Sequence, residues 1–365
     1  MPGKTVIECS KPLKLFERIV LDIWLIVFYC TIHVAIFGSL CLAFSSFRLY
    51  AFLLVLLYIA ATCAYADSTK EGAPWREFTE NFYFIGLGRR FFPLTVTLTD
   101  GLWNLAETFH KASEEERREI QKQQWIIASF PHGVECNYRL LVDGLLYRAL
   151  PFLGPWRSLA ASVLFRVPFL REVALFTHCV DASRDTAEFC LRKGFSIQLI
   201  PGGEMEQVLT HKGKETVYLK RRTGFIRLAL KFQAKVIPQY VFGQNDCFET
   251  TTFLLGLRTW IVKNLRMCFT LSWGSWSPIH SQKVAQNVVF GDPLDAATFA
   301  REWIKKKGKD AEGVDIDKWR GKGKEAEPPK ELIEACHAEF MRRLTETFDT
   351  FKGEYGYGSR ELQVI

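Results

Sequence analysis

Three short apolar segments of this chain each run into a glycine turn, and this pattern limits the folds that the chain can adopt. The segments and their turns are, in order, Trp125–Ser129 with Gly133, Ile197–Ile200 with Gly202 and Gly203, and Lys235–Phe242 with Gly243. Short apolar runs bounded by glycine or proline are typical of buried strands, and the stretches between them have helical spacing. We therefore predict an α/β fold with a mainly parallel sheet and flanking helices, in which the three turns meet at one edge.

A histidine lies in the first of these turns. In the sequence Ser-Phe-Pro-His-Gly, Pro131 and Gly133 end the predicted strand, and a helix is predicted from Val134 to Leu150. His132 is therefore expected at the carboxyl end of a strand, where open sheets bind their ligands. A loop histidine that only caps the next helix or binds backbone also fits this pattern.

Two acidic residues, Glu204 and Glu206, follow the second turn, Pro201–Gly203. If the turns meet, a carboxylate can orient the imidazole of His132 and stabilise its protonated form. We expect Glu206 to do so, with Glu204 as the alternative.

Longer motifs lie around and beyond the turns. The most specific block is Arg222–Ala229, Val236–Pro238 and Phe242–Asp246; further motifs are Pro201–Gly203 with Glu206, Val167–Glu172, Ala182–Thr186, Ser272–Gly274, Gly291–Pro293 and Phe351–Gly356. Through them the chain resembles, from Trp75 onward, the type 2 diacylglycerol acyltransferase family, which includes monoacylglycerol and wax-alcohol acyltransferases. The block has Gln244 where the family pattern has glutamate. Animal members carry His-Pro-His-Gly, so Phe130 replaces their first histidine, and the match of the second histidine to His132 implies retained activity.

The resemblance implies acyl transfer from acyl-CoA to a lipid hydroxyl. One histidine acting as general base contributes roughly 10²–10⁴ to such a rate, and we assign this role to His132. Backbone N–H groups of Gly133, or of Gly202 and Gly203, can hold the thioester oxyanion, with Pro131 supporting the loop. No Gly-x-Ser-x-Gly motif accompanies the histidine, so a serine hydrolase is not expected. We predict no cofactor, since acyl-CoA is a substrate. We also predict no metal, because the cysteines and histidines lack the spacing of metal ligands.

Basic residues precede the glycine that opens the third helix. Lys220, Arg221 and Arg222 lie just before Gly224, and together they suit the phosphates of coenzyme A. A solvated or headgroup-facing basic surface is an equally good interpretation. A net charge of +7 without a basic stripe spaced by aromatic residues does not indicate nucleic acid binding.

Two apolar stretches near the N-terminus predict a membrane anchor. Residues 19–46 and 49–66 suit spanning helices of roughly 20 residues, and their short connection predicts a helical hairpin. More basic residues flank the hairpin than lie in its connection, which places both termini in the cytosol. A hairpin within one leaflet fits nearly as well. We divide the chain into a cytosolic segment 1–18, the hairpin 19–66 and an acyltransferase domain 67–365, with a solvated or disordered charged insertion at about 301–330.

These features together predict an O-acyltransferase of the endoplasmic reticulum membrane that makes triacylglycerol from acyl-CoA and diacylglycerol, with association to lipid droplets. The 48% hydrophobic and 14% aromatic content agrees with lipid contact, and the 10 cysteines, without Cys-x-x-Cys pairs, are expected to be reduced. Monoacylglycerol, wax-alcohol and sterol acyltransferases use the same chemistry and remain alternatives. A catalytically silent lipid-binding or droplet-tethering protein is another, which Phe130 leaves open.

Overall fold

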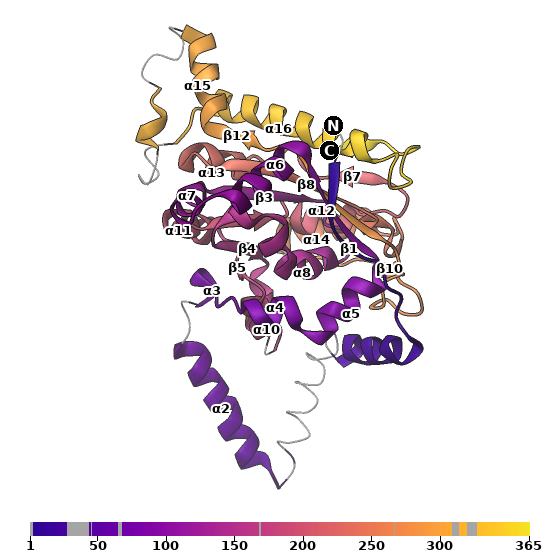
Figure 1. Cartoon of the computed structure of the whole chain (residues 1–365). Coiled ribbons are helices and arrows are strands. Elements are labelled where there is room, and N and C mark those ends of the chain that lie inside the picture. Colours follow the sequence, from indigo (N-terminus) through magenta and orange to yellow (C-terminus); the bar gives the residue numbers. More distant parts are fainter. Residues whose placement is uncertain are drawn as a thin grey trace.

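A nine-stranded sheet forms the centre of the protein in the computed structural model (Figure 1). The structure describes residues 3–27, 44, 46–64, 68–167, 169–265, 267–308, 314–319 and 327–365. The strands of this sheet are β1 (Gly3–Cys9), β2 (Leu94–Thr99), β3 (Trp125–Phe130), β4 (Trp156–Ala160), β5 (Cys179–Asp181), β6 (Ser196–Leu199), β8 (Lys235–Phe242), β11 (Gln286–Phe290) and β12 (Leu294–Asp295). Their order is β1-β2-β11-β8-β3-β6-β4-β5, and β12 pairs with β8.

The predicted strands β8, β3 and β6 are neighbours and run parallel. Ile126 of β3 pairs with Ile197 of β6 on one side and with Val236 of β8 on the other. Strands β4 and β5 continue the parallel part, whereas β11 runs antiparallel to β8. Because parallel neighbours end at the same edge, the three glycine turns lie together, as the sequence predicts.

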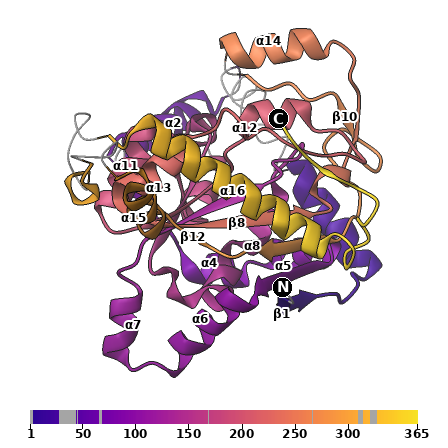
Figure 2. The ribbon, with the colours of Figure 1, turned by 90° about the horizontal axis from the view of Figure 1, so that it is seen from above.

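Helices cover both faces of the sheet, so its central strands are apolar on both sides. In β3, Ile126, Ala128 and Phe130 face one layer and Trp125 and Ile127 face the other, which is the period-2 alternation of a strand. The first layer contains α11 (Arg184–Arg192), α13 (Gly224–Phe232), α15 (Ala296–Lys307) and α16 (Lys330–Phe351). The second contains α5 (Tyr83–Phe91), α6 (Asp100–Lys111), α8 (Asn137–Val142) and α9 (Leu146–Ala149). Figure 2 shows α16 crossing β8.

The predicted helix Val134–Leu150 is broken in the structure. It consists of α8, a 3-10 turn at Asp143–Leu145 and α9, and it begins at Asn137. Gly144 lies in this turn against the backbone of Thr79, and a side chain there would meet the Thr79 carbonyl oxygen. The close approach of two backbones at this position accompanies the break.

The charged insertion predicted at 301–330 begins within a helix, and the residues that the structure describes there are partly exposed and partly buried. Helix α15 continues to Lys307, and the Asp295 side chain caps its start by accepting the N–H of Thr298 at 3.0 Å. Ile316 and Trp319 are buried and belong to the same core cluster as residues of α13 and α16. Residues 309–313 and 320–326 lie outside the described residues.

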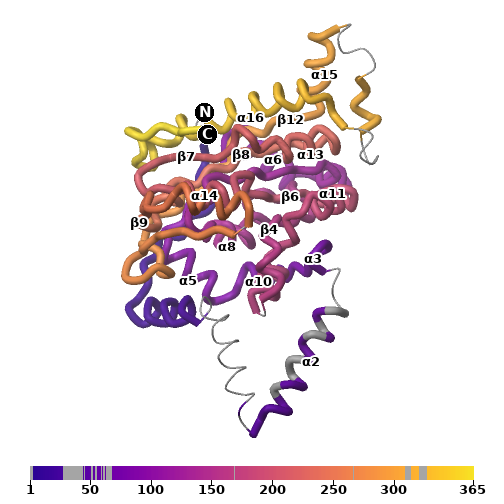
Figure 3. Tube along the Cα trace, turned by 180° about the vertical axis from the view of Figure 1, so that it is seen from behind, coloured from indigo at the N-terminus to yellow at the C-terminus, as the bar shows by residue number. Residues whose placement is uncertain are grey.

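The N-terminal apolar stretches are helical where the structure describes them. Residues 15–27 form a helix, and α2 (Arg48–Ala64) extends away from the body in Figures 1 and 3. Tyr58 of α2 donates to Glu172 of α10 (Leu170–Phe176) at 3.3 Å. Among the described residues, no helix combines the length and the apolar character needed to cross a membrane. The predicted hairpin thus finds no support there, and its residues 28–43, 45, 65 and 66 lie outside the described part. Further short helices of the protein are α3 (Ser68–Glu71), α4 (Arg76–Asn81) and α7 (Glu114–Ile120).

Phe130, which stands where animal members of the resembled family carry their first histidine, is a core residue here. Its side chain is completely buried, and its ring centroid lies 6.2 Å from that of Phe340 on α16. An imidazole at this position would be surrounded by apolar groups and would lose its hydrogen bonds to water.

We therefore expect Phe130→His to lower the free energy of unfolding by about 2–4 kcal/mol, since a buried polar group without a partner adds to the lost packing. Phe130→Leu, which stays apolar, is the matched control and should cost about half as much or less. Chemical denaturation of the purified variants measures both. Equal stability of the two variants would contradict this assignment of Phe130 to the core.

Candidate active site

His132 lies in the loop directly after β3, at the carboxyl edge of the sheet. The residue as a whole is half-buried, and Nδ1 lies 3.0 Å from the carbonyl oxygen of Gly133. A carbonyl oxygen only accepts hydrogen bonds, so Nδ1 carries the proton and Nε2 keeps its lone pair. Burial lowers the pKa of His132 below its usual value. The imidazole is therefore neutral at physiological pH and ready to accept a proton at Nε2.

Glu206, on α12 (Gly203–Leu209), holds the main chain of this loop. One carboxylate oxygen accepts the backbone N–H of His132, and the other accepts the N–H of Tyr218 at 2.7 Å. The side chain is 2% exposed. Burial raises the pKa of the Glu206 carboxyl to about 7, although the two N–H donors and Arg222 act in the opposite direction. The contact differs from the prediction, since the carboxylate binds the backbone of His132 and the ring is held by Gly133.

The predicted glycines surround His132 and Glu206. Gly133 has a φ of +68°, and a side chain there would collide with Gln244; one at Gly202 would collide with the Glu206 carboxylate. The N–H of Gly203 is used, because it donates to the Ile200 carbonyl at 3.1 Å. Within the part of the chain that the structure describes, the N–H groups of Gly133 and Gly202 have no acceptor. These two amides are the candidates that remain for an oxyanion.

The basic residues before α13 divide into two groups. Lys220 and Arg221 are exposed, and neither side chain forms an ion pair with a described residue. Arg222 is half-buried: Nη2 donates to the Gly202 carbonyl at 3.2 Å, and the guanidinium lies 5.1 Å from the Tyr218 ring centroid. Its buried Nε has no hydrogen-bond partner. The structure thus brings Arg222 to Glu206 and the glycine turn, while Lys220, Arg221 and Gly224 lie on the surface.

Sequence reasoning missed a buried polar row beneath the loop. Gln198 of β6 donates to Ser129 of β3 at 3.3 Å and to Gln239 of β8 at 3.2 Å, and it accepts from Ser158 of β4 at 3.0 Å. All four side chains are at most 2% exposed. These bonds join four parallel strands close to the edge that carries His132. The available signal was a polar residue inside each of several otherwise apolar strand segments.

Gln244 is a second missed residue. It is 1% exposed, lies against Gly133 and donates its amide N–H to the carbonyl oxygen of Glu135. An ionised glutamate, which the resembled family has at this position, cannot donate that bond. The substitution in the sequence was visible, but its contact with the histidine loop was not.

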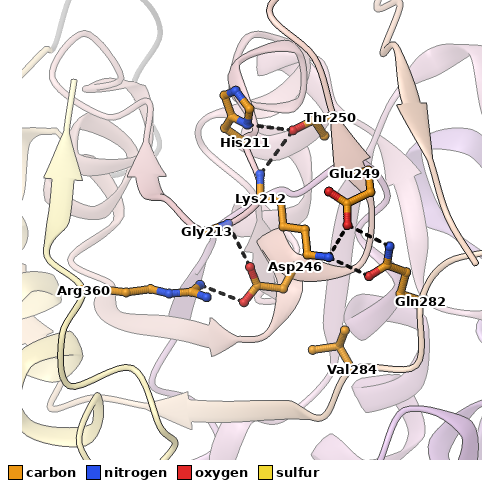
Figure 4. Close-up of a pocket in the computed structure, with 9 residues that line it drawn as sticks. All are labelled: His211, Lys212, Gly213, Asp246, Glu249, Thr250, Gln282, Val284 and Arg360. Carbon is orange, nitrogen blue, oxygen red and sulfur yellow. Dashed lines mark hydrogen bonds and ion pairs between the residues drawn. The ribbon is translucent and has the colours of Figure 1, made fainter.

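A polar cleft of about 480 Å³ lies next to the 3-10 turn Gln244–Asp246 (Figure 4). It is lined by His211, Lys212, Gly213, Asp246, Glu249, Thr250, Gln282, Val284 and Arg360. Lys212 pairs with Glu249, and Arg360 pairs with Asp246 at 2.7 Å. The positive charges of Lys212 and Arg360 are therefore neutralised by carboxylates within the cleft.

Comparisons with known proteins identify the family to which the chain is similar. A family model described as diacylglycerol acyltransferase matches residues 44–300. Diacylglycerol O-acyltransferase 2 of Mus musculus is 24% identical over 327 residues, covering 85% of this chain and 73% of that protein. Diacylglycerol O-acyltransferase 2-like protein 6 of Bos taurus is 28% identical over 268 residues, covering 67% and 71%.

Among solved structures, the 1-acyl-sn-glycerophosphate (LPA) acyltransferase PlsC of Thermotoga maritima matches with a TM-score of 0.36 and 13% identity, covering 83% of this chain and 100% of that chain. A score this low carries no argument. The family match, by contrast, covers more than half of the chain. This protein belongs to the diacylglycerol acyltransferase family and is an acyl-CoA-dependent acyltransferase.

Proposed function

We propose that the protein transfers a fatty acyl group from acyl-CoA to the free hydroxyl of diacylglycerol, forming triacylglycerol, with His132 as general base. The observation that carries this proposal is the 3.0 Å contact between His132 Nδ1 and the Gly133 carbonyl. This contact leaves Nε2 as a proton acceptor at the carboxyl edge of the sheet. The relatives named diacylglycerol O-acyltransferase 2 support diacylglycerol as the acceptor.

The proposed reaction needs one base and one oxyanion site. His132 Nε2 takes the hydroxyl proton as the acceptor oxygen attacks the thioester carbon. The N–H groups of Gly133 and Gly202 stabilise the negative carbonyl oxygen of the tetrahedral intermediate. When the carbon–sulfur bond breaks, the imidazolium returns the proton to the coenzyme A thiolate. The ester and free coenzyme A are the products, and no acyl-enzyme forms.

Coenzyme A carries phosphates that need uncompensated positive charge. Lys220 and Arg221 offer it close to the Gly202 turn, whereas the cations of the cleft in Figure 4 are already paired with carboxylates. We therefore place the phosphates beside Lys220, Arg221 and the exposed Gly224. The membrane hairpin at 19–66, cytosolic termini and a location at the endoplasmic reticulum and lipid droplets belong to this proposal, as does the lack of a cofactor.

We expect His132→Ala to lower kcat by at least about 10²–10⁴, because the general base is lost. Alanine keeps the backbone N–H that Glu206 binds, so the loop and the melting temperature should change little. Labelled acyl-CoA with diacylglycerol in detergent micelles measures the transfer, and monoacylglycerol, wax-alcohol and sterol acceptors run in parallel identify the preferred substrate. Turnover near the wild-type level in a folded variant would remove His132 from the mechanism.

The pKa of Glu206 predicts a pH-dependent stability. Its folded value of about 7 exceeds the value of roughly 4.3 for an unfolded chain. The folded state therefore holds a proton that the unfolded state releases between these values, and stability falls as pH rises from about 4.5 to about 7. The full loss approaches about 4 kcal/mol.

We expect Glu206→Gln to lack this loss, since its amide does not ionise. Denaturation of both proteins at several values between pH 5 and 8 isolates Glu206, because all other titrating groups are shared. As pH rises, the free energy of unfolding of the wild-type protein should fall relative to that of the variant. Parallel curves would show that the carboxylate ionises at an ordinary pH.

Replacing Lys220 and Arg221 together by glutamine should raise the KM for acyl-CoA about tenfold and weaken its dependence on salt, because screened attraction to phosphate is removed. The matched control is Lys305→Gln with Lys306→Gln, which removes two exposed charges from α15. The KM for diacylglycerol should stay the same in both. An equal increase of the acyl-CoA KM in the control would show that the effect comes from the net charge of the protein and not from these two positions.

Arg222→Gln should instead lower kcat and stability, since Arg222 contacts the Gly202 turn.

A further inference from the structure

The segment that follows the catalytic turns exposes an unusual number of large apolar side chains. It comprises α14 (Leu255–Leu265), the strand pair β9 (Glu249–Thr250) with β10 (Ser272–Trp273), and the turn after them. The exposed residues, which we call the α14 surface, are Phe253, Leu254, Leu257, Trp260, Leu265, Met267, Phe269, Leu271, Trp273 and Trp276, each between 42% and 64% exposed. Figures 2 and 3 show α14 on the outside of the molecule. Patches of this kind mark contact with a partner or a membrane.

Helix α14 presents an apolar side outward. Arg258 and Val262, one turn apart, are 6% and 5% exposed and face the protein, whereas Leu257 and Trp260 are more than half exposed. A helix that faces water usually has its apolar residues inward and its polar residues outward. The outer side of α14 is therefore suited to an apolar medium.

The charges of this segment select a negatively charged surface. Glu249 of β9 pairs with Lys212, and no acidic residue follows it in the sequence until after Gly291. Of the basic residues in this stretch, Lys263 and Lys283 are exposed, whereas Arg258 faces the protein. Lys263 is exposed on α14, next to the apolar residues. Basic residues among exposed tryptophans and leucines are typical of segments that lie in the interface of an anionic bilayer.

The tryptophans at the end of the segment are held by a tight turn. Trp276 stacks on His280 with 3.8 Å between the ring centroids, and the N–H of Gly274 donates to the Ser277 carbonyl at 3.0 Å. A side chain on Gly274 would collide with the carbonyl oxygen of His280. The turn thus holds Trp273 and Trp276 with their side chains about half exposed.

The α14 surface is directly connected to the candidate active site. Val262 of α14 packs against Met205 and Val208 of α12. The same short helix carries Glu206, which binds the backbone of His132. One layer of packing therefore separates the exposed apolar side of α14 from the catalytic loop.

We propose that the α14 surface inserts into the interface of an anionic phospholipid bilayer and holds the catalytic loop at the membrane, where a lipid acceptor is dissolved. The purpose of this contact rests on the proposed acyl transfer to diacylglycerol, but the contact itself does not require turnover. It is separate from the hairpin predicted at 19–66.

Photo-crosslinking of the full chain tests the contact. Benzoylphenylalanine replaces Leu257 or Trp260 in two variants, and Lys306, exposed on α15, in a control. Each is reconstituted in vesicles of phosphatidylcholine with 30% phosphatidylserine, or of phosphatidylcholine alone. We expect phospholipid adducts at Leu257 and Trp260 at least fivefold above the control, with a higher yield in the anionic vesicles. Adding Lys263→Gln should reduce the difference between the two vesicle types.

Two outcomes of the crosslinking experiment would overturn the proposal. Adducts at the level of the Lys306 control would show that the surface does not meet lipid, and adducts between two copies of the chain at Leu257 would assign it to an interface between proteins. The same crosslinks in His132→Ala separate this proposal from the catalytic one, because they do not depend on acyl transfer. Leu257→Ser with Trp260→Ser should also raise the KM for diacylglycerol about tenfold while the KM for acyl-CoA and the melting temperature stay unchanged. An unchanged diacylglycerol KM would contradict a role in acceptor supply.

Discussion

The arrangement of the candidate site depends on one buried carboxylate. Glu206 accepts the backbone N–H groups of His132 and Tyr218, and so ties the loop after β3 to α12 and to the segment that follows β7 (Glu215–Val217). Arg222 adds a bond from this segment to the Gly202 carbonyl. Because the bonds involve main-chain atoms, the position of the histidine loop is fixed independently of the side chain that it carries.

The central strands were predictable because their signals are local. Apolar runs that end at Gly133, Gly202 and Gly243 identify β3, β6 and β8, and the intervening helical segments favour parallel neighbours. The pairing of β11 was not predictable in this way. Val288 lies between Val241 and Val96, and the latter is almost 200 residues earlier in the chain. Only packing over the whole sheet selects such a partner.

The site was predictable in its residues but not in its contacts. The sequence places His132 and Glu206 at turns that meet, yet it does not say which atoms touch, and the carboxylate binds backbone instead of the ring. Gln198 and Gln239 looked like ordinary exceptions in apolar strands, because their bonds form only when β6, β3 and β8 align. Residue types and spacing thus define the candidate chemistry, whereas alignment of distant strands defines its geometry.

Helix α12 connects the two surfaces on which the proposed substrates arrive. Glu206 and Gln207 face the histidine loop, where Gln207 donates to the Val134 carbonyl at 2.6 Å. Met205 and Val208 face Val262 of α14. One side of this short helix therefore contacts the catalytic loop, and another side contacts the inner face of α14. Because the packing is rigid, the position of α14 fixes the position of the catalytic loop. Under the two proposals made above, the coenzyme A part of the thioester and the lipid alcohol would approach His132 from different environments, water beside Lys220 and Arg221 and the bilayer beside α14.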